Sequence, residues 1–492
     1  MSSAGYCNSS GIITRASRPN LCAITASFSS ASAGGSKRPS VESFLLRADE
    51  NPLILAIDNG SSSVRAGLFD ATGREACEIV KIKRAFQTGS NGESELDPLA
   101  AIAQTGNAID RLFASDKAAF VQNVSICAFW HSLCGMDSNS EPTTPILGWA
   151  DTRAREYSTL LKQSFNEKEI HERTGAHFHS SFWPAKLLWI REQRPDIWKR
   201  TTHWVSFSDL CQLRLFGDAR TSVSMASATG MFDQATLAWD TELLDFIGLD
   251  QNQMPEIAGS GSTIHPSLEA LTRWPQLSNA DILPAIGDGA ADTLGAGCSR
   301  LGEAVLMVGT SASMRMMYEG EPPRNLPEGL WSYRLDERRV VVGGALSDGG
   351  NLISMLRRKF GVKGNITQEL RSRTHDRSLR VEPYYFGERS TGYREDAKGE
   401  IIGLDARHDG IDVIHSAMHA IADRLADIAE RLERTAPIES IQASGGTLRE
   451  YPVWREIIEE KLGRRIMPSN TRESSLKGTV LRAAERLGNI EV

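Results

Sequence analysis

Two short bends rich in hydroxyl groups each lie between two apolar runs of the chain. The first is Gly60-Ser61-Ser62-Ser63, followed by Arg65, and the second is Gly309-Thr310-Ser311, followed by Arg315. Backbone N–H groups and hydroxyls bind phosphate well because they donate hydrogen bonds without bulk, and an arginine adds a charge-assisted contact. The first bend therefore predicts a phosphate-binding turn, and the second bend repeats its pattern. The alternative is two unrelated solvated hairpin turns, since Gly and Ser are ordinary turn residues.

Two aspartates accompany these bends. Asp58 directly precedes the first bend, and Asp288 lies at a strand-to-helix junction in the stretch ILPAIGDGAADTLGAG. A carboxylate within hydrogen-bonding reach of an alcohol can accept its proton. Asp is also favoured at the start of a helix, so a capping role for Asp288 stays open beside the chemical one, and the two roles are compatible.

Other common site patterns are missing from the sequence. It has no GxxxxGK[ST] motif and no GxGxxG after a strand, which argues against P-loop and Rossmann proteins. The seven cysteines form no C-x-x-C pair, so neither a zinc site nor a disulfide framework is indicated. His415 and His419 have a spacing that can bind metal, but no HExxH glutamate lies between them, and His419 neighbours an apolar stripe.

Length and composition limit the class of protein. A chain of 492 residues is too long for one core, so two domains are expected. A net charge of −7 gives no basic field for nucleic acid. No apolar run approaches the roughly 18 residues that cross a bilayer. These features predict a soluble protein of a reducing compartment, the cytoplasm, with no nucleic-acid or membrane partner.

The first 41 residues contain no Asp or Glu and are rich in Ser and Ala, with Arg15, Arg18, Lys37 and Arg38 among them. Such a composition is seen in organelle transit peptides, which would change the compartment. A disordered tail and a start codon placed too early are the alternatives for residues 1–50. We expect the fold to begin near Asn51.

The pattern of elements repeats along the chain. Strands are expected at 53–58, 64–70 and 74–86, then a helix at 97–114 and a buried strand at 123–130. The second half opens on strands at 303–320, 330–335 and 338–346, followed by a helix at 411–434, a strand at 438–444 and a last helix from 473. This internal duplication predicts two like-folded α/β domains facing each other across a cleft.

Several separated motifs, in order, resemble the FGGY carbohydrate kinases from residue 51 to about 487. They are IDNGSSSVR, GDGAADTLGAG, MVGTSASMR, the GER of YYFGERSTGY, and ASGGTLREYPVW. The resemblance implies two actin-like (ribonuclease H-like) domains at a central cleft, each with a mixed five-stranded sheet flanked by helices. Residues 51–299 would form the sugar-binding N-terminal domain with the first phosphate loop, and 300–492 the ATP-binding C-terminal domain.

The family likeness also implies roles for single residues, with ATP and Mg²⁺ as cofactors. Asp288 would be the catalytic base, and Asp58 would hold Mg²⁺ through water. The implied ATP-binding residues are Gly60, Ser61, Ser62, Ser63, Arg65, Gly309, Thr310, Ser311, Gly350, Gly445, Gly446 and Thr447. The implied substrate-binding residues are Trp130, His131, Asp151, Arg153, Asp288 and Arg315.

SMASATGMFD and TGAHFHSSFWPAKLLWIRE look most like the gluconokinase branch, which implies phosphorylation of D-gluconate to 6-phosphogluconate. Burying the gluconate carboxylate needs a cation, and Arg315, Arg153 and Lys186 are the candidates. A kinase for xylulose, ribulose or another polyol is the close alternative. A catalytically silent sugar sensor on the same fold and an ATPase of the actin or chaperone type are alternatives from other classes. The expected partner is a small-molecule sugar or sugar acid, and the sequence leaves a monomer and a homodimer open.

Overall fold

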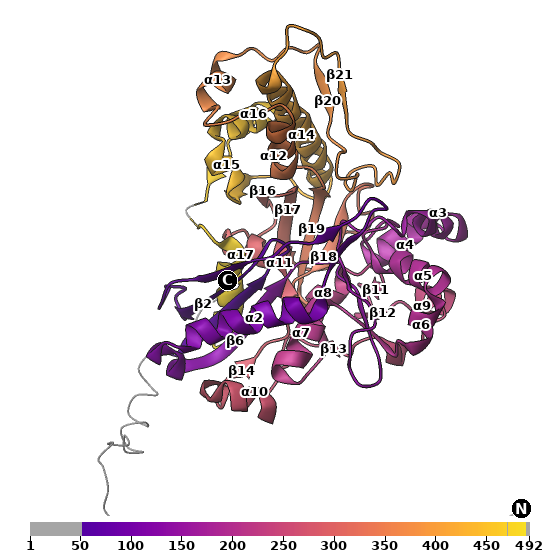
Figure 1. The fold of residues 1–492 in the computed structure, drawn as a ribbon, viewed down its shortest axis with the longest axis vertical. Helices are drawn as coiled ribbons and strands as arrows, with labels where there is room; N and C mark the ends of the chain where they lie inside the picture. The colour runs from indigo at the N-terminus through magenta and orange to yellow at the C-terminus, as the bar shows by residue number, and fades with distance from the viewer. Residues whose placement is uncertain (1–51, 470, 489–492) are drawn as a thin grey trace, which may run out of the picture. The chain divides into compact units, whose positions relative to one another are not determined.

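Each half of the chain is built on a mixed sheet whose first two strands form a hairpin (Figure 1). The computed structural model describes residues 52–469 and 471–488, so the expected tail or targeting segment of residues 1–50 lies outside the described residues. Among the described residues, no helix combines the length and apolar character needed to cross a membrane.

The first sheet has the order β14-β6-β1-β2-β3, and β15 also pairs with β6. Its central strand β1 is buried at every position, as expected for a strand covered on both faces. β1 runs antiparallel to β2 and parallel to β6. The strands are β1 (Leu53–Asn59), β2 (Ser63–Asp70), β3 (Val80–Lys83), β6 (Val121–Ala128), β14 (Asp281–Ile282) and β15 (Ile286–Gly287).

The second sheet repeats this topology with the order β18-β19-β17-β16-β22-β23. Its strand β16 runs antiparallel to β17 and parallel to β22, as β1 does to β2 and β6. The strands are β16 (Glu303–Val308), β17 (Ala312–Glu319), β18 (Trp331–Arg334), β19 (Arg339–Leu346), β22 (Ser440–Ser444) and β23 (Met467–Pro468). The matching topology confirms the predicted duplication and the two-domain α/β fold.

Two details differ from the sequence-based expectation. Each sheet has six strands instead of the five that the family resemblance implies, and the two-residue strands β14, β15 and β23 are too short to show an alternating pattern. The strand expected at 74–86 is reduced to β3, since the polar stretch before it makes only an isolated bridge between Phe69 and Glu75.

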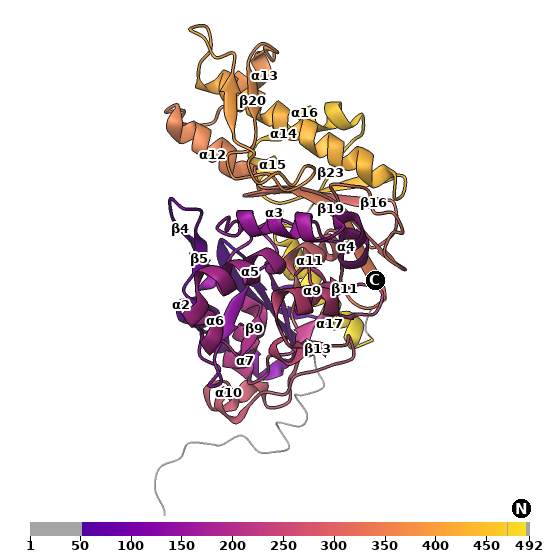
Figure 2. The same cartoon turned by 90° about the vertical axis from the view of Figure 1, so that its right-hand side faces the viewer.

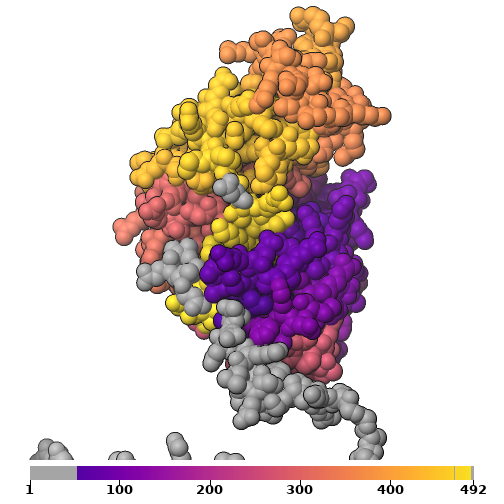
Figure 3. All heavy atoms as spheres, turned by 90° about the vertical axis from the view of Figure 1, so that its left-hand side faces the viewer, coloured from indigo at the N-terminus to yellow at the C-terminus, as the bar shows by residue number. Residues whose placement is uncertain are grey.

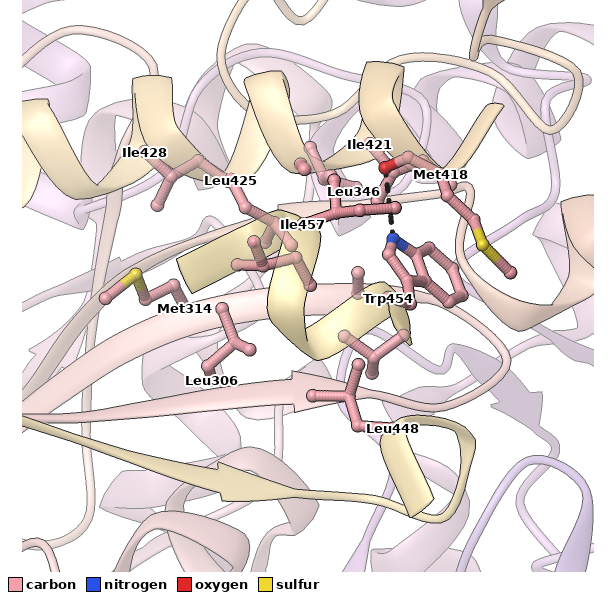
Figure 4. Packing of buried hydrophobic residues seen from close by; sticks show 14 of the residues in the cluster. Leu306, Met314, Leu346, Met418, Ile421, Leu425, Ile428, Leu448, Trp454 and Ile457 are labelled. Atoms are coloured by element: carbon pink, nitrogen blue, oxygen red, sulfur yellow. Dashed lines mark hydrogen bonds between the residues drawn. The ribbon is translucent and has the colours of Figure 1, made fainter. Parts of the chain in front are cut away.

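Helices cover the sheets as layers. Helix α14 (Gly410–Glu433) and its neighbours α12 (Gly350–Lys359) and α16 (Pro452–Leu462) lie over the second sheet (Figures 1 and 2). The apolar face of α14 packs on the strands, and Trp454 Nε1 donates a hydrogen bond to the Met418 carbonyl across this core (Figure 4). Helix α2 (Pro98–Phe113) packs against the first sheet.

The last helix, α17 (Ser474–Arg486), leaves the second lobe and packs on the first sheet. Leu476 and Val480 of this helix share a buried cluster with Ile54 and Ala56 of β1. Figure 3 shows the yellow C-terminal residues directly against indigo N-terminal ones. α17 also crosses α11 (Asp288–Gly295) so closely that a Cβ atom at Gly478 would collide with the Ala291 carbonyl.

Shorter elements complete the described chain. The helices are α3 (Arg155–Ser164), α4 (Glu167–Thr174), α5 (Trp183–Gln193), α6 (Pro195–Arg200), α7 (Phe207–Phe216), α8 (Val223–Ser227), α9 (Thr241–Ile247), α10 (Leu268–Arg273), α13 (Thr367–Ser372) and α15 (Thr447–Glu450). The strands are β4 (Gln87–Thr88), β5 (Ser94–Leu96), β7 (Cys134–Met136), β8 (Ile146–Leu147), β9 (His203–Val205), β10 (Thr221–Ser222), β11 (Phe232–Asp233), β12 (Ala238–Trp239), β13 (Ile257–Ala258), β20 (Arg380–Glu382) and β21 (Glu400–Ile402).

Candidate active site

Both hairpin bends and the N-terminus of α11 line one cavity of about 480 Å³. The loop after β22 and a group of aromatic side chains complete its walls. Fourteen of the residues singled out in the sequence line it: Asp58, Gly60, Ser61, Ser62, Arg65, Trp130, His131, Asp288, Gly309, Thr310, Ser311, Arg315, Gly445 and Gly446. Segments far apart in the chain thus contribute hydroxyls, backbone donors and carboxylates to a single space.

Three further expected nucleotide residues lie just outside the lining. Ser63 is buried, and its hydroxyl accepts a hydrogen bond of 3.3 Å from Arg65 Nε. The Gly350 amide and the Thr447 hydroxyl both donate to the Gly309 carbonyl, at 2.8 and 3.4 Å. A Cβ atom at Gly350 would lie only 2.6 Å from that carbonyl, so glycine permits this close approach. Gly350 and Thr447 therefore support the second bend from behind.

Arg65 and Arg315 do not occupy equivalent positions in the two hairpins. In the first hairpin, Asn59–Val64 is the strand pair next to the bend, and Asp58–Arg65 is the second pair from it. In the second hairpin, the second pair from the bend is Met307–Ser313. Arg315 lies two residues beyond Ser313, opposite Val305. The first bend is one residue longer than the second, and this difference is not visible when Gly60 is aligned with Gly309.

Asp58 is almost completely buried and lies beside the first bend. Burial raises the pKa of its carboxyl, and Arg65 opposes the shift with Nη1 3.3 Å from Asp58 Oδ2. Arg65 also pairs with Glu473, the residue before α17. Among residues 52–469 and 471–488, no three potential ligands gather into a metal cage. The single carboxylate of Asp58 fits Mg²⁺, which binds through one or two carboxylates plus water and phosphate oxygens.

Asp288 is the first residue of α11, and the N-cap position is occupied by Gly287 instead. Burial raises the pKa of Asp288 to about 7, the negative charge of Asp58 adds to the shift, and Arg315 opposes it. A carboxylate with a pKa near neutrality is suited to accept a proton. The Trp130 ring packs directly on the backbone on both sides of Asp288, because a Cβ atom at Gly287 or Gly289 would collide with it.

His131 lines the cavity, and its hydrogen bond defines the tautomer of its ring. Its Nδ1 lies 2.6 Å from the Ala228 carbonyl, which can only accept, so Nδ1 carries the hydrogen. Burial lowers the pKa of His131 to about 3, so the ring is neutral and Nε2 is an acceptor. A neutral acceptor in a cavity wall is suited to a sugar hydroxyl.

Two of the expected substrate residues do not line the cavity. Asp151 and Arg153 pair with each other at 2.6 Å, and Arg153 pairs with Glu95 as well. The Asp151 carboxylate also accepts from the Ser94 amide, while the Arg153 guanidinium stacks over Trp189. Both side chains are used within the fold of the first lobe.

The other two expected carboxylate partners are also engaged. Arg315 lines the cavity but pairs with Asp292 and donates to Ser313 and Thr293, each at 2.9 Å. Lys186 Nζ donates to the His131 and Gly148 carbonyls at 2.9 and 2.8 Å and lies outside the lining. Burial lowers the pKa of Lys186 to about 7.

Several cavity residues were missed in the sequence. Asp292 lies one helical turn after Asp288, a spacing that would have pointed to it. Arg389 belongs to the GER motif, which gave no role by itself. The remaining missed residues include Phe182, Trp331, Tyr333, Tyr393 and Glu473. No short-range pattern joins these positions, since they come together only through the arrangement of the two lobes.

Comparisons with known proteins agree with this arrangement of lobes and motifs. Residues 53–294 match the family model of the N-terminal domain of the FGGY carbohydrate kinases, and residues 304–486 match that of the C-terminal domain. The chain belongs to the FGGY family of carbohydrate kinases. Membership makes it a carbohydrate kinase by family, which means phosphoryl transfer to an alcohol group of a small sugar.

Individual relatives refine the picture. A gluconokinase of Bacillus subtilis (strain 168) is 25% identical over 460 residues, covering 89% of this chain and 88% of the relative. The crystal structure of gluconate kinase from Lactobacillus acidophilus has a TM-score of 0.80 at 24% identity and covers 90% of this chain and 91% of its own. The xylulose kinase from the same organism also has a TM-score of 0.80 at 24% identity, over 89% and 90%. The fold alone does not separate these two enzymes as models for this chain.

Proposed function

We propose that this FGGY kinase transfers the γ-phosphoryl group of ATP to the primary hydroxyl of a sugar acid, with D-gluconate as substrate. The observation that carries the proposal is that both bends and Asp288 line one cavity. Donors for a triphosphate and an acid for the acceptor alcohol are thereby held at one place.

The chain's own groups would act as follows. The backbone N–H groups and hydroxyls of Gly60–Ser62 and Gly309–Ser311 would orient the triphosphate from two sides. The Asp288 carboxylate would accept the proton of the attacking hydroxyl as the new P–O bond forms. Neutral His131 would accept a hydrogen bond from another hydroxyl through Nε2. Mg²⁺ near Asp58 would neutralise charge on the phosphate oxygens.

The nucleoside end of ATP would lie along the loop after β22. Gly445 has a φ of +83°, and a Cβ atom there would lie 2.6 Å from the Val308 carbonyl. At Gly446 a Cβ atom would meet nothing within 4 Å, so the space beside its backbone is open. These two positions support the assignment of Gly445, Gly446 and the adjoining Thr447 to nucleotide binding.

D-gluconate is favoured over xylulose by similarity to the gluconokinase of Bacillus subtilis across nearly the whole chain. A xylulose kinase activity is the second candidate, since the Lactobacillus acidophilus xylulose kinase is equally similar in fold. The test is an ADP-release assay over D-gluconate, D-xylulose, L-ribulose and glycerol. Gluconate is expected to give the highest kcat/KM. A higher kcat/KM for xylulose would make xylulose the substrate in place of gluconate. ADP release that does not depend on any sugar would contradict the proposed kinase activity.

A further inference from the structure

The three cations expected from the sequence to receive a sugar-acid carboxylate are all engaged by other groups of the fold. Arg153 and Lys186 lie outside the cavity lining, and Arg315 is held by the Asp292 carboxylate. A carboxylate taken out of water needs a cation or several N–H donors, so another group must supply them if the acceptor is an acid. This step rests on the function proposed above.

We propose that Arg389 binds the carboxylate of the sugar acid and so makes the enzyme select acids over neutral sugars. Arg389 lines the cavity and stacks over the Trp149 ring, with its guanidinium carbon 4.4 Å from the ring centroid. Its Nη2 donates 2.9 Å to the Leu346 carbonyl. These two contacts hold the guanidinium plane in one orientation.

The remaining donors of Arg389 are not used by the described fold. Its buried Nε has no hydrogen-bond partner among the described residues. Within the same residues, no carboxylate comes within ion-pair distance of its guanidinium. Burial lowers the pKa of Arg389, and the nearby Tyr393, Tyr333, Asp288 and Asp348 oppose this shift without forming an ion pair with it, although an arginine stays charged. A planar guanidinium with free donors matches the two oxygens of a carboxylate.

The cavity has the layout that a two-ended substrate requires. Trp149 and Phe182 of the first lobe and Tyr333 and Tyr393 of the second line it together with Arg389. Asp288 and Arg389 both line this cavity, and the two groups do not pair with each other among the described residues. An acyclic acid could therefore place its terminal hydroxyl at Asp288 and its carboxylate at Arg389.

The other cations of the cavity lie beside the bends or the nucleotide loop. Lys81 pairs with Arg65 in the register of β2 and β3. Arg449 follows Gly446 in α15, and Arg472 directly precedes Glu473. Arg65 itself is paired with Asp58 and Glu473. These positions suit phosphate, which leaves Arg389 for the far end of the acceptor.

The test compares Arg389→Met with the wild type on D-gluconate and on D-gluconamide, which keeps the hydroxyls but lacks the charge. Loss of a charge-assisted contact should raise KM for gluconate roughly ten- to a hundred-fold while changing KM for gluconamide by less than about threefold. Arg394→Met is the matched control, because its side chain pairs with Glu388 outside the cavity lining, and KM for gluconate should not change. Thermal unfolding of each variant checks the fold.

Arg389→Lys is the second variant, should the methionine variant unfold. It keeps the charge but loses the planar fork, so KM for gluconate should rise less and KM for gluconamide should stay unchanged. Equal effects on gluconate and gluconamide, or no effect of either substitution on gluconate, would overturn the role of Arg389 alone. A wild-type enzyme that phosphorylates only neutral sugars would overturn the proposed substrate and this role together.

Discussion

Asp288 and Asp292 lie one turn apart on α11, and their surroundings give them opposite properties. Asp292 pairs with Arg315 of β17, accepts 2.8 Å from Ser444 of β22 and accepts from Ser474 of α17. Asp288 lacks such a set of partners, and burial raises its pKa to about 7. One carboxylate thus joins four elements from both lobes, while the other stays available for proton transfer.

The first prediction concerns Asp288. Asp288→Asn should lower kcat by roughly a hundred- to ten-thousand-fold, because the amide cannot accept the proton of the hydroxyl. Binding of ATP should be unchanged, as measured by calorimetry with a non-hydrolysable analogue. Near-normal turnover in this variant would remove Asp288 from the chemistry, and weakened nucleotide binding would point to a structural role.

The second prediction is a pH profile. With a pKa near 7, Asp288 is protonated and inactive as a base at lower pH, so kcat/KM for the acceptor should fall below about pH 7 and level off above it. The measurement is kcat/KM from pH 5 to 9 at saturating MgATP. A profile flat down to pH 5 would contradict the raised pKa.

The same shift predicts a change in stability. A carboxyl whose pKa is higher in the folded state than in the unfolded state binds its proton more tightly when folded. Its ionisation therefore costs stability as pH rises from about 3.8, its ordinary value, to about 7. Asp288→Asn removes this cost, so its gain in Tm over the wild type should be larger at pH 8 than at pH 4. An equal gain at both pH values would show that the effect is not titration.

The fourth prediction concerns the Asp292–Arg315 pair. Asp292→Ala leaves a buried guanidinium without its carboxylate, which should lower the free energy of unfolding by about 3–5 kcal/mol. The double variant Asp292→Ala/Arg315→Met should recover part of the loss, because no unpaired charge remains. Urea unfolding of wild type, both single variants and the double variant forms a complete cycle. Additive losses would mean that the two side chains are not coupled.

The fifth prediction separates nucleotide binding from folding at Gly446. A Cβ atom there meets nothing within 4 Å, and φ is −83°, so Gly446→Ala should unfold at the wild-type temperature. If ATP lies against this backbone, KM for ATP should rise while KM for the sugar acid stays the same. An unchanged KM for ATP would place the nucleotide elsewhere.

The sequence was most informative where burial follows a simple period. The buried runs of β1 and β16 and the helical spacing of α14 allowed these elements to be predicted, and the ordered motifs allowed the family to be recognised. Contacts between segments that lie far apart in the chain could not be predicted from the sequence. The apolar positions of α17 predict a buried face but do not say which sheet it covers. Arg153 and Lys186 were candidate ligands by charge, yet nearby partners use them within the fold.

The packing of α17 on β1 has a consequence for synthesis of the protein. During translation the residues of the first sheet leave the ribosome long before the helix that covers them does. Until the thirteen residues of α17 have been synthesised, the helix cannot cover Ile54 and Ala56 of β1. A nascent chain that ends before Ser474 would therefore have a first lobe without its covering helix, even when all strands of the first sheet are present.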